Sequence, residues 1–110
     1  MKPDQQALVR ALNDALRKDH RNGRIFITSG VVSLGPNFVA LAVSAVARFT
    51  EFDEGNDPWG EHDFGAITVL GAKVFWKIDY YDLTLTAGAE DPSDSQTCVR
   101  VLTVMLSDEY

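Results

Sequence analysis

The stretch FGAITVLGAKVFWKIDYYD, residues 64–82, decides the fold. In its second half, successive side chains alternate between two faces, as they do in a half-buried strand. The residues that share one face are Val74, Trp76, Ile78 and Tyr80, and those that share the other are Phe75, Lys77, Asp79 and Tyr81. An apolar run precedes a Gly71-Ala72 turn, so the pattern predicts a β-hairpin over about residues 64–82.

Outward from the hairpin, the sequence predicts helices at residues 4–19 and about 36–49, because apolar residues recur there every three or four positions. RIFIT, residues 24–28, has the composition of a short strand. LTLTAG, residues 83–88, extends the hairpin or adds a third strand. Residues 91–110 read as a final helix, since Ser93 and Gln96 have capping-box spacing.

The predicted order is therefore α-β-α-β-β-(β)-α. We expect a single α+β domain over residues 1–110, with a small antiparallel sheet and helices packed on one face. Strand order is left open.

The charge of the chain is unevenly distributed. Residues 1–50 carry seven Lys/Arg against three Asp/Glu, and residues 51–110 carry three against thirteen, which gives the net charge of −6. Direct nucleic-acid binding is not expected, because phosphate contacts need a concentrated basic surface. The sequence has no signal-peptide pattern and no apolar run long enough for a membrane span, and it has a single cysteine, Cys98. We therefore expect a cytoplasmic protein without membrane attachment.

NDPWGEHDFG, residues 56–65, is the densest polar stretch of the chain. It closes a segment, residues 50–63, that lacks periodicity and is long for a loop in a compact domain. Counting outward from the predicted turn, Leu70 faces Lys73 and Asp63 roughly faces Tyr80. His62 then lies near Tyr81, and Glu61 near Asp82.

This juxtaposition leaves alternatives open. A general acid/base site would use His62 with Glu61 and Asp63 as catalytic candidates. A metal site is not predicted, although a weak alternative set exists: His62, Asp63, Asp79 and Asp82. The structural alternative is that these polar groups hydrogen-bond the loop backbone and hold Trp59 against the sheet. No cofactor motif occurs, so no cofactor is predicted.

Several blocks in this order resemble one family. They are RALNDALR (10–17), ITSGV (27–31), NDPWGEHDFG (56–65), FWKIDYYD (75–82), EDPSD (90–94) and RVLTVML with DEY (100–110). The chain resembles the small bacterial proteins filed as domain of unknown function 3768 from about residue 7 to Tyr110. The resemblance implies a setting on plasmids and other mobile elements, and it transfers no catalytic residue.

Three functions follow as hypotheses. We favour a protein-binding accessory factor, with a counter-defence or regulatory role, that acts through an acidic and aromatic surface. That surface comprises Asp57, Trp59, Glu61, Asp79, Tyr81 and Asp82. The alternative is a metal-assisted or acid/base hydrolase centred on His62, so enzyme activity is left undecided. Self-association through the oppositely charged halves is the third.

Overall fold

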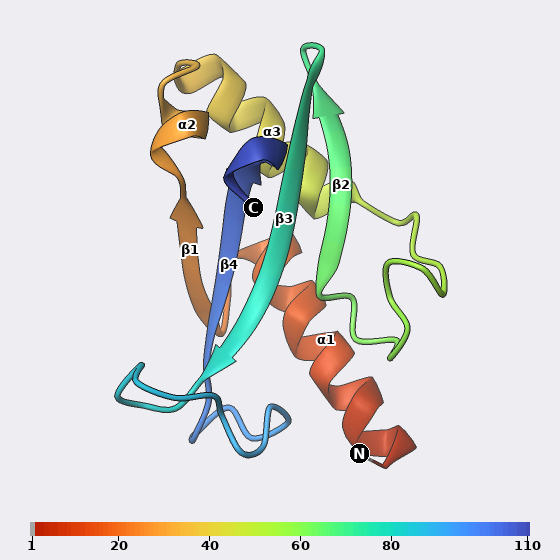
Figure 1. Cartoon of the computed structure of the whole chain (residues 1–110). Helices are drawn as coiled ribbons and strands as arrows, with labels where there is room; N and C mark the ends of the chain where they lie inside the picture. The colour runs from red at the N-terminus through yellow and green to blue at the C-terminus, as the bar shows by residue number, and fades with distance from the viewer. Residues whose placement is uncertain (1) are drawn as a thin grey trace.

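A computed structural model describes residues 2–110 of the chain. Three helices precede the hairpin in the described chain: α1 (Pro3–Asp19), the short α2 (Ser29–Val32) and α3 (Pro36–Arg48). The strands are β1 (Gly23–Ile27), β2 (Phe64–Val69), β3 (Ala72–Tyr81) and β4 (Val99–Leu106), and a 3₁₀ turn, η1 (Ser107–Glu109), follows. The fold is a small α+β domain, as predicted (Figure 1).

The four strands form one mixed sheet in the order β1-β4-β3-β2. β2 and β3 are antiparallel, which confirms the hairpin, and β3 and β4 are antiparallel as well. β1 pairs with β4 in parallel, so the wholly antiparallel sheet that we expected is wrong. Residues 29–32, which lie between the predicted strand and the predicted second helix, form α2.

The predicted C-terminal helix is also wrong, because residues 99–106 form β4 at the centre of the sheet. Ser93 and Gln96 do not cap a helix: the Ser93 hydroxyl bonds Asp91 and the Gln96 amide bonds Asp94, both within turns. β4 has apolar residues on both of its faces, so they also fall at helical spacings. LTLTAG is a loop after β3, held by one isolated bridge between Tyr81 and Gly88.

The hairpin turn lies one residue earlier than predicted. Val69 pairs with Ala72, and the two residues between them, Leu70 and Gly71, both have positive φ, 48° and 83°. Positive φ at both positions is the geometry of a type I′ turn. The shift moves the register by two residues, so that Asp63 lies opposite Ile78, whose amide donates to the Asp63 carbonyl at 2.8 Å.

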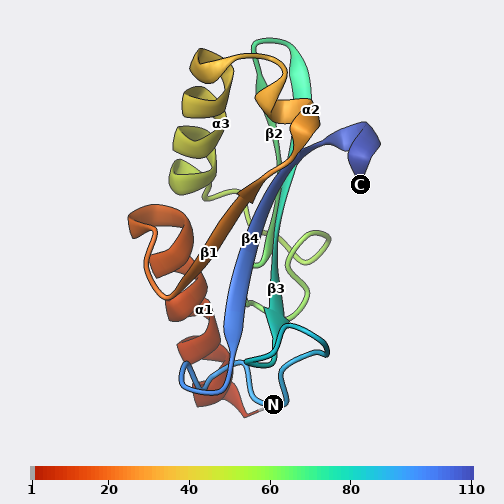
Figure 2. The same ribbon diagram turned by 90° about the vertical axis from the view of Figure 1, so that its left-hand side faces the viewer.

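Helices α1 and α3 cover one face of the sheet, as expected, and the C-terminal turn lies on the other side (Figure 2). The covered face carries the predicted alternation, since Val74, Trp76 and Ile78 are all buried. They pack with residues from β4 and the helices in one core: Leu102, Val104, Leu16, Phe38, Ala42 and Val46. Within residues 2–110, no helix has the length and apolarity that crossing a membrane requires.

Candidate functional site

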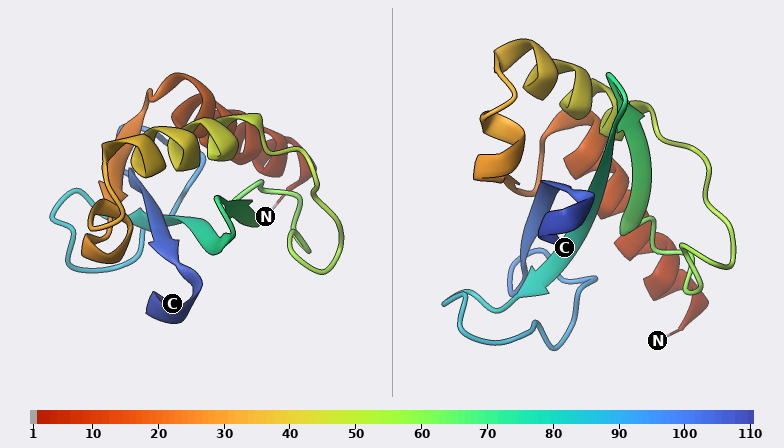
Figure 3. Two further views of the ribbon diagram at one scale, coloured as in Figure 1. Left: turned by 90° about the horizontal axis from the view of Figure 1, so that it is seen from above. Right: turned by 45° about the horizontal axis from the view of Figure 1, so that its top comes forward.

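The segment of residues 49–63 leaves the end of α3, projects beyond β2 and returns to the start of that strand (Figure 3). Asp57 organises its second half. The buried Asp57 carboxylate accepts hydrogen bonds from the backbone amides of Glu61 and His62, at 2.9 and 3.1 Å. Gly60 and His62 both have positive φ in the tight loop that results. Asp57, predicted to belong to a binding surface, therefore stabilises the loop from inside.

His62 faces helix α1. Its Nδ1 lies 3.0 Å from Asp14 Oδ1, and its Nε2 lies 3.8 Å from Asp57 Oδ2. The ring also stacks on Phe52, with ring centroids 3.8 Å apart and planes within 4°. Both ring nitrogens lie toward carboxylates of the protein itself, Nδ1 at hydrogen-bond distance and Nε2 at the longer distance of an ion pair.

Arg17 connects the same cluster to α3. It is buried, pairs with Asp14 at 2.9 Å, and donates to the carbonyls of Val46 and Phe49 at 3.0 and 2.8 Å. Those carbonyls belong to the end of α3, where helical hydrogen-bond partners run out. The guanidinium also lies 5.1 Å from the Phe52 ring centroid, a cation–π distance. Arg17 thus fastens α1, the end of α3 and the loop to one another.

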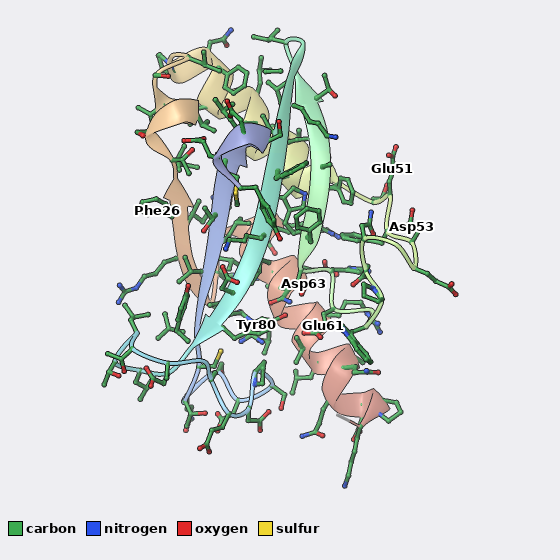
Figure 4. All side chains as sticks on the ribbon, in the orientation of Figure 1. Phe26, Glu51, Asp53, Glu61, Asp63 and Tyr80 are labelled. Carbon is green, nitrogen blue, oxygen red and sulfur yellow. The ribbon has the colours of Figure 1, made fainter. Side chains whose placement is uncertain are left out.

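A second polar network lies further along α1. The fully buried Arg100 of β4 donates from Nε to Asn13 Oδ1 at 2.8 Å. Asn13 is also fully buried, and its Nδ2 donates to the Tyr80 hydroxyl at 2.8 Å and to the Glu61 carbonyl at 3.0 Å. The Tyr80 hydroxyl donates in turn to Glu61 Oε1 at 2.8 Å. Figure 4 shows Tyr80 and Glu61 near each other.

The electrostatics of this network reflect burial. Among residues 2–110, no carboxylate lies within hydrogen-bond distance of Arg100: its other guanidinium contacts are the Pro92 carbonyl and Cys98 Sγ. Burial lowers the pKa of Arg100, and burial, followed by the hydrogen bond to Glu61, raises that of Tyr80. Tyr80 is therefore a neutral donor, and the buried cation depends on neutral acceptors.

Asp63 is the most perturbed carboxyl of the stretch. Burial, and then the negative charge of Glu61, raises its pKa to about 6. A raised pKa beside other acids is a feature of general acids in enzymes. Here, however, the structure brings no histidine or cation to Asp63 within salt-bridge distance among residues 2–110.

The carboxylates of DYYD lie elsewhere. Asp79 pairs with Lys77 at 3.1 Å on the face of the sheet that the helices leave open. Asp82 accepts hydrogen bonds from the amides of Thr84 and Thr86, which lie in the loop after β3. Across residues 2–110, no three His, Cys, Asp or Glu side chains are grouped so as to hold a metal ion. The expected single patch is therefore divided between two sides of the molecule.

The open face of the sheet carries the remaining candidates. Asp79 and Tyr81 lie there with Lys77, and Trp59, 68% exposed, borders the face from the loop. Two adjoining open hollows of about 430 Å³ each share Lys77, Asp79 and Tyr110. Tyr110 packs edge-on against Phe64 and Phe75, with centroids 6.0 and 5.7 Å apart. Phe26, 59% exposed, lines the second hollow.

Sequence reasoning missed much of both regions. The predicted helix at residues 4–19 contains Asn13, Asp14 and Arg17, and the predicted C-terminal helix contains Arg100. None of the four was identified as part of a buried network. One signal was available for Arg100: Val99, Val101, Thr103 and Val104 surround it, and β-branched residues favour strands. No comparable signal marks Phe26 or Tyr110, because their exposure depends on which sheet face the helices cover.

Comparison with known proteins gives a family and no activity. No curated protein and no solved structure matches the chain significantly. A family model matches residues 27–109, a range that includes His62, Tyr80 and Arg100 and starts after α1. The chain belongs to this family, which is described as Protein of unknown function (DUF3768).

Proposed function

We propose that this protein is a protein-binding accessory factor, and that it binds its partner through the open face of the sheet. The observation that carries the proposal is the set of aromatic side chains that the helices leave uncovered. They are Phe26, Trp59, Phe64, Phe75, Tyr81 and Tyr110. Aromatic residues are enriched where proteins bind one another, because they bury a large area at low entropic cost.

The charges around this face indicate the chemistry of the partner. The charged side chains that line the two hollows are Lys77, Asp63, Asp79 and Glu109, one cation against three acids. A partner surface that presents Lys or Arg gains ion pairs here, and its cations can also lie over exposed rings such as Trp59. We therefore propose a basic protein surface as the partner.

Nucleic acid is the competing ligand for an aromatic sheet face. Exposed rings on a four-stranded sheet can stack on unpaired bases, as in several RNA-binding folds. Such proteins also supply cations for the phosphates, and the lining of the two hollows offers one, Lys77, which is already paired with Asp79. The charge balance favours a protein. The family resemblance adds the proposed setting, an accessory protein of a mobile element.

The test begins with capture of a partner by the tagged chain, followed by binding of the purified partner in a titration. A variant with Phe26→Ser, Trp59→Ala and Tyr81→Ala removes three rings from the open face. Leu70→Ala is the matched control, because Leu70 is equally apolar and 72% exposed but lies at the hairpin tip. We expect the triple variant to lower the affinity at least tenfold and the control to leave it unchanged.

Salt and nuclease distinguish the remaining outcomes. Affinity should fall as salt rises from about 50 to 300 mM, since exposed charge pairs are screened over about 10 Å at 0.1 M. A partner that still binds the triple variant would place the interface elsewhere. A complex that nuclease dissolves would replace the protein partner with a nucleic acid.

A further inference from the structure

A second surface, separate from the open face, lies at the free edge of β2. β2 is an outer strand of the sheet, paired with β3 on one side. Because the Ile78 amide donates to the Asp63 carbonyl opposite it, the odd-numbered residues of β2 make the hydrogen bonds to β3. The amides and carbonyls of Ala66 and Thr68 therefore point outward. Within residues 2–110, these outward amides and carbonyls have no hydrogen-bond partner.

This edge lacks the usual protection. Outer strands commonly carry charged residues or proline, which prevent another strand from pairing with them. β2 reads FGAITV and has neither, whereas β1, at the opposite edge, carries Arg24. Ala66 and Thr68 are both exposed. An uncharged edge with free backbone groups can accept a further strand.

The edge of β2 also forms one wall of a groove. The other wall is the end of α3 with the first residues of the following segment, Arg48 to Glu51. The groove has a volume of about 410 Å³, and Ala66, Ile67, Thr68 and Lys73 line it from the hairpin. In Figure 3 the segment of residues 49–63 curves outward beside β2 and returns to the start of that strand.

The charges of the groove differ from those of the chain as a whole. Arg48 and Lys73 are exposed at its rim, and neither has an ion-pair partner among the described residues. Glu51 is the single acid in the lining, so the groove carries a net charge of +1 on a chain of −6. Lys73 Nζ lies 5.4 Å from the Phe75 ring centroid, a cation–π distance. A ligand with carboxylates beside its strand would meet two cations that have no ion-pair partner among the described residues.

We propose that this groove binds an extended peptide segment of a partner protein, which adds as a strand to β2 and places acidic side chains beside Arg48 and Lys73. β2 has six residues, so its edge pairs with a short extended segment. A second copy of the chain would bring its own projecting loop and a further charge of −6, which opposes association. The proposal does not depend on the open-face function.

The test uses two synthetic ten-residue peptides of alternating valine and threonine. One has glutamate at both ends and the other has lysine. Binding to the isotope-labelled full chain is followed by amide chemical shifts. We expect the glutamate peptide to shift the Ala66 and Thr68 amides and slow their hydrogen exchange, with an affinity at least tenfold above that of the lysine peptide.

Two variants separate the backbone and charge contributions. Ala66→Pro removes an outward amide that takes no part in the β2–β3 pairing, so the fold should survive while the peptide no longer binds. Arg48→Glu with Lys73→Glu should reverse the preference between the peptides by at least tenfold. Lys18→Glu with Arg24→Glu changes the net charge equally at a distance from the groove and should leave the preference unchanged.

Several results would overturn the proposal. They are no shift with the glutamate peptide at millimolar concentration, equal binding of both peptides, shifts confined to β1 or the open face, and unchanged binding by the charge-reversed variant. The last measurement stands even if Ala66→Pro fails to fold. Dimerisation in sedimentation equilibrium that Ala66→Pro abolishes would assign the edge to a second copy instead.

Discussion

The two sides of the β2–β3 hairpin use polar and aromatic residues in opposite ways. On the helix side, Asn13, Arg17 and Arg100 are buried and bonded, and the ring of His62 is stacked on Phe52. On the open side, Trp59 and Phe26 are more than half exposed. The helix side has the features of a structural network, in which each group fixes another. The open side has the features of a surface that a partner can cover.

The comparison shows how one short stretch contributes to both sides. In NDPWGEHDFG, Asp57 bonds the loop from inside, and Glu61 and His62 fasten it to α1 through Asn13 and Asp14. Trp59 stays exposed at the border of the open face. A dense polar motif can therefore serve to hold one aromatic residue in place. The following substitutions, from the largest expected effect to the smallest, test the contrast between the bonded helix side and the exposed open side.

Asn13→Ala should have the largest effect on the helix side. It leaves the Nε of a fully buried arginine, Arg100, without an acceptor and also removes a donor to Tyr80. A buried charged donor left without its acceptor costs about 3 kcal/mol in the free energy of unfolding. Urea unfolding measures the loss, with Lys18→Ala on the exposed side of α1 as the control. A loss below about 1 kcal/mol would show that the network is not required.

His62→Ala should have an intermediate effect, because it removes the stack on Phe52 and the contact with Asp14. His20→Ala is a closely matched control, since His20 and His62 have φ of 58° and 56°, and alanine is equally strained at both. The difference between the two variants should be about 2 kcal/mol. Hydrogen exchange should quicken across residues 50–63 in His62→Ala alone. Equal stability of the variants would contradict the fastening role.

Asp63→Asn should stabilise the protein by about 1 kcal/mol at pH 7, after allowance for solvent screening. The pKa of Asp63 is raised to about 6, so the folded state binds the proton more tightly than the unfolded state does. Stability is therefore lost as pH rises from about 4 to 6. Urea unfolding from pH 4.5 to 7.5 should show that loss in the wild type and a smaller one in Asp63→Asn. Asp79→Asn, which breaks an exposed pair, serves as the control.

The smallest effect on stability should come from the open face. Trp59→Ala and Phe26→Ser alter side chains that are mostly exposed, so each should change the free energy of unfolding by less than about 0.5 kcal/mol. Thermal unfolding measures this, with Leu70→Ala again as the comparison. A large destabilisation would mean that these rings stabilise the fold and would weaken the contrast between the two sides.

The hairpin was predictable from the sequence because its alternation is a local property. Trp76 and Ile78 point into the core as their spacing indicated, and Asp79 and Tyr81 point away. The register was wrong by two residues, because Leu70 occupies a positive-φ turn position that usually goes to asparagine, aspartate or glycine. That shift alone moves Glu61 from Asp82 to Tyr80.

The networks were not predictable because their members are far apart in sequence. Asn13 and Arg100 are 87 residues apart, and His62 and Asp14 are 48 residues apart. A polar residue on a helix gives no local sign of such a partner. β4 was missed for a different reason: apolar residues occupy both of its faces, so its sequence lacks the alternation of apolar and polar residues that would have identified a strand.

The position of β4 has a consequence for how the protein folds. β4 is the last strand of the chain but lies between β1 and β3, so residues 99–106 must be in place before β1 joins the sheet. During synthesis the β2–β3 hairpin can form early, while β1 remains without its neighbour. Pairing of strands separated by about 70 residues of chain is slow, because a long loop must close first. We therefore expect refolding to be limited by the docking of β4 rather than by the hairpin.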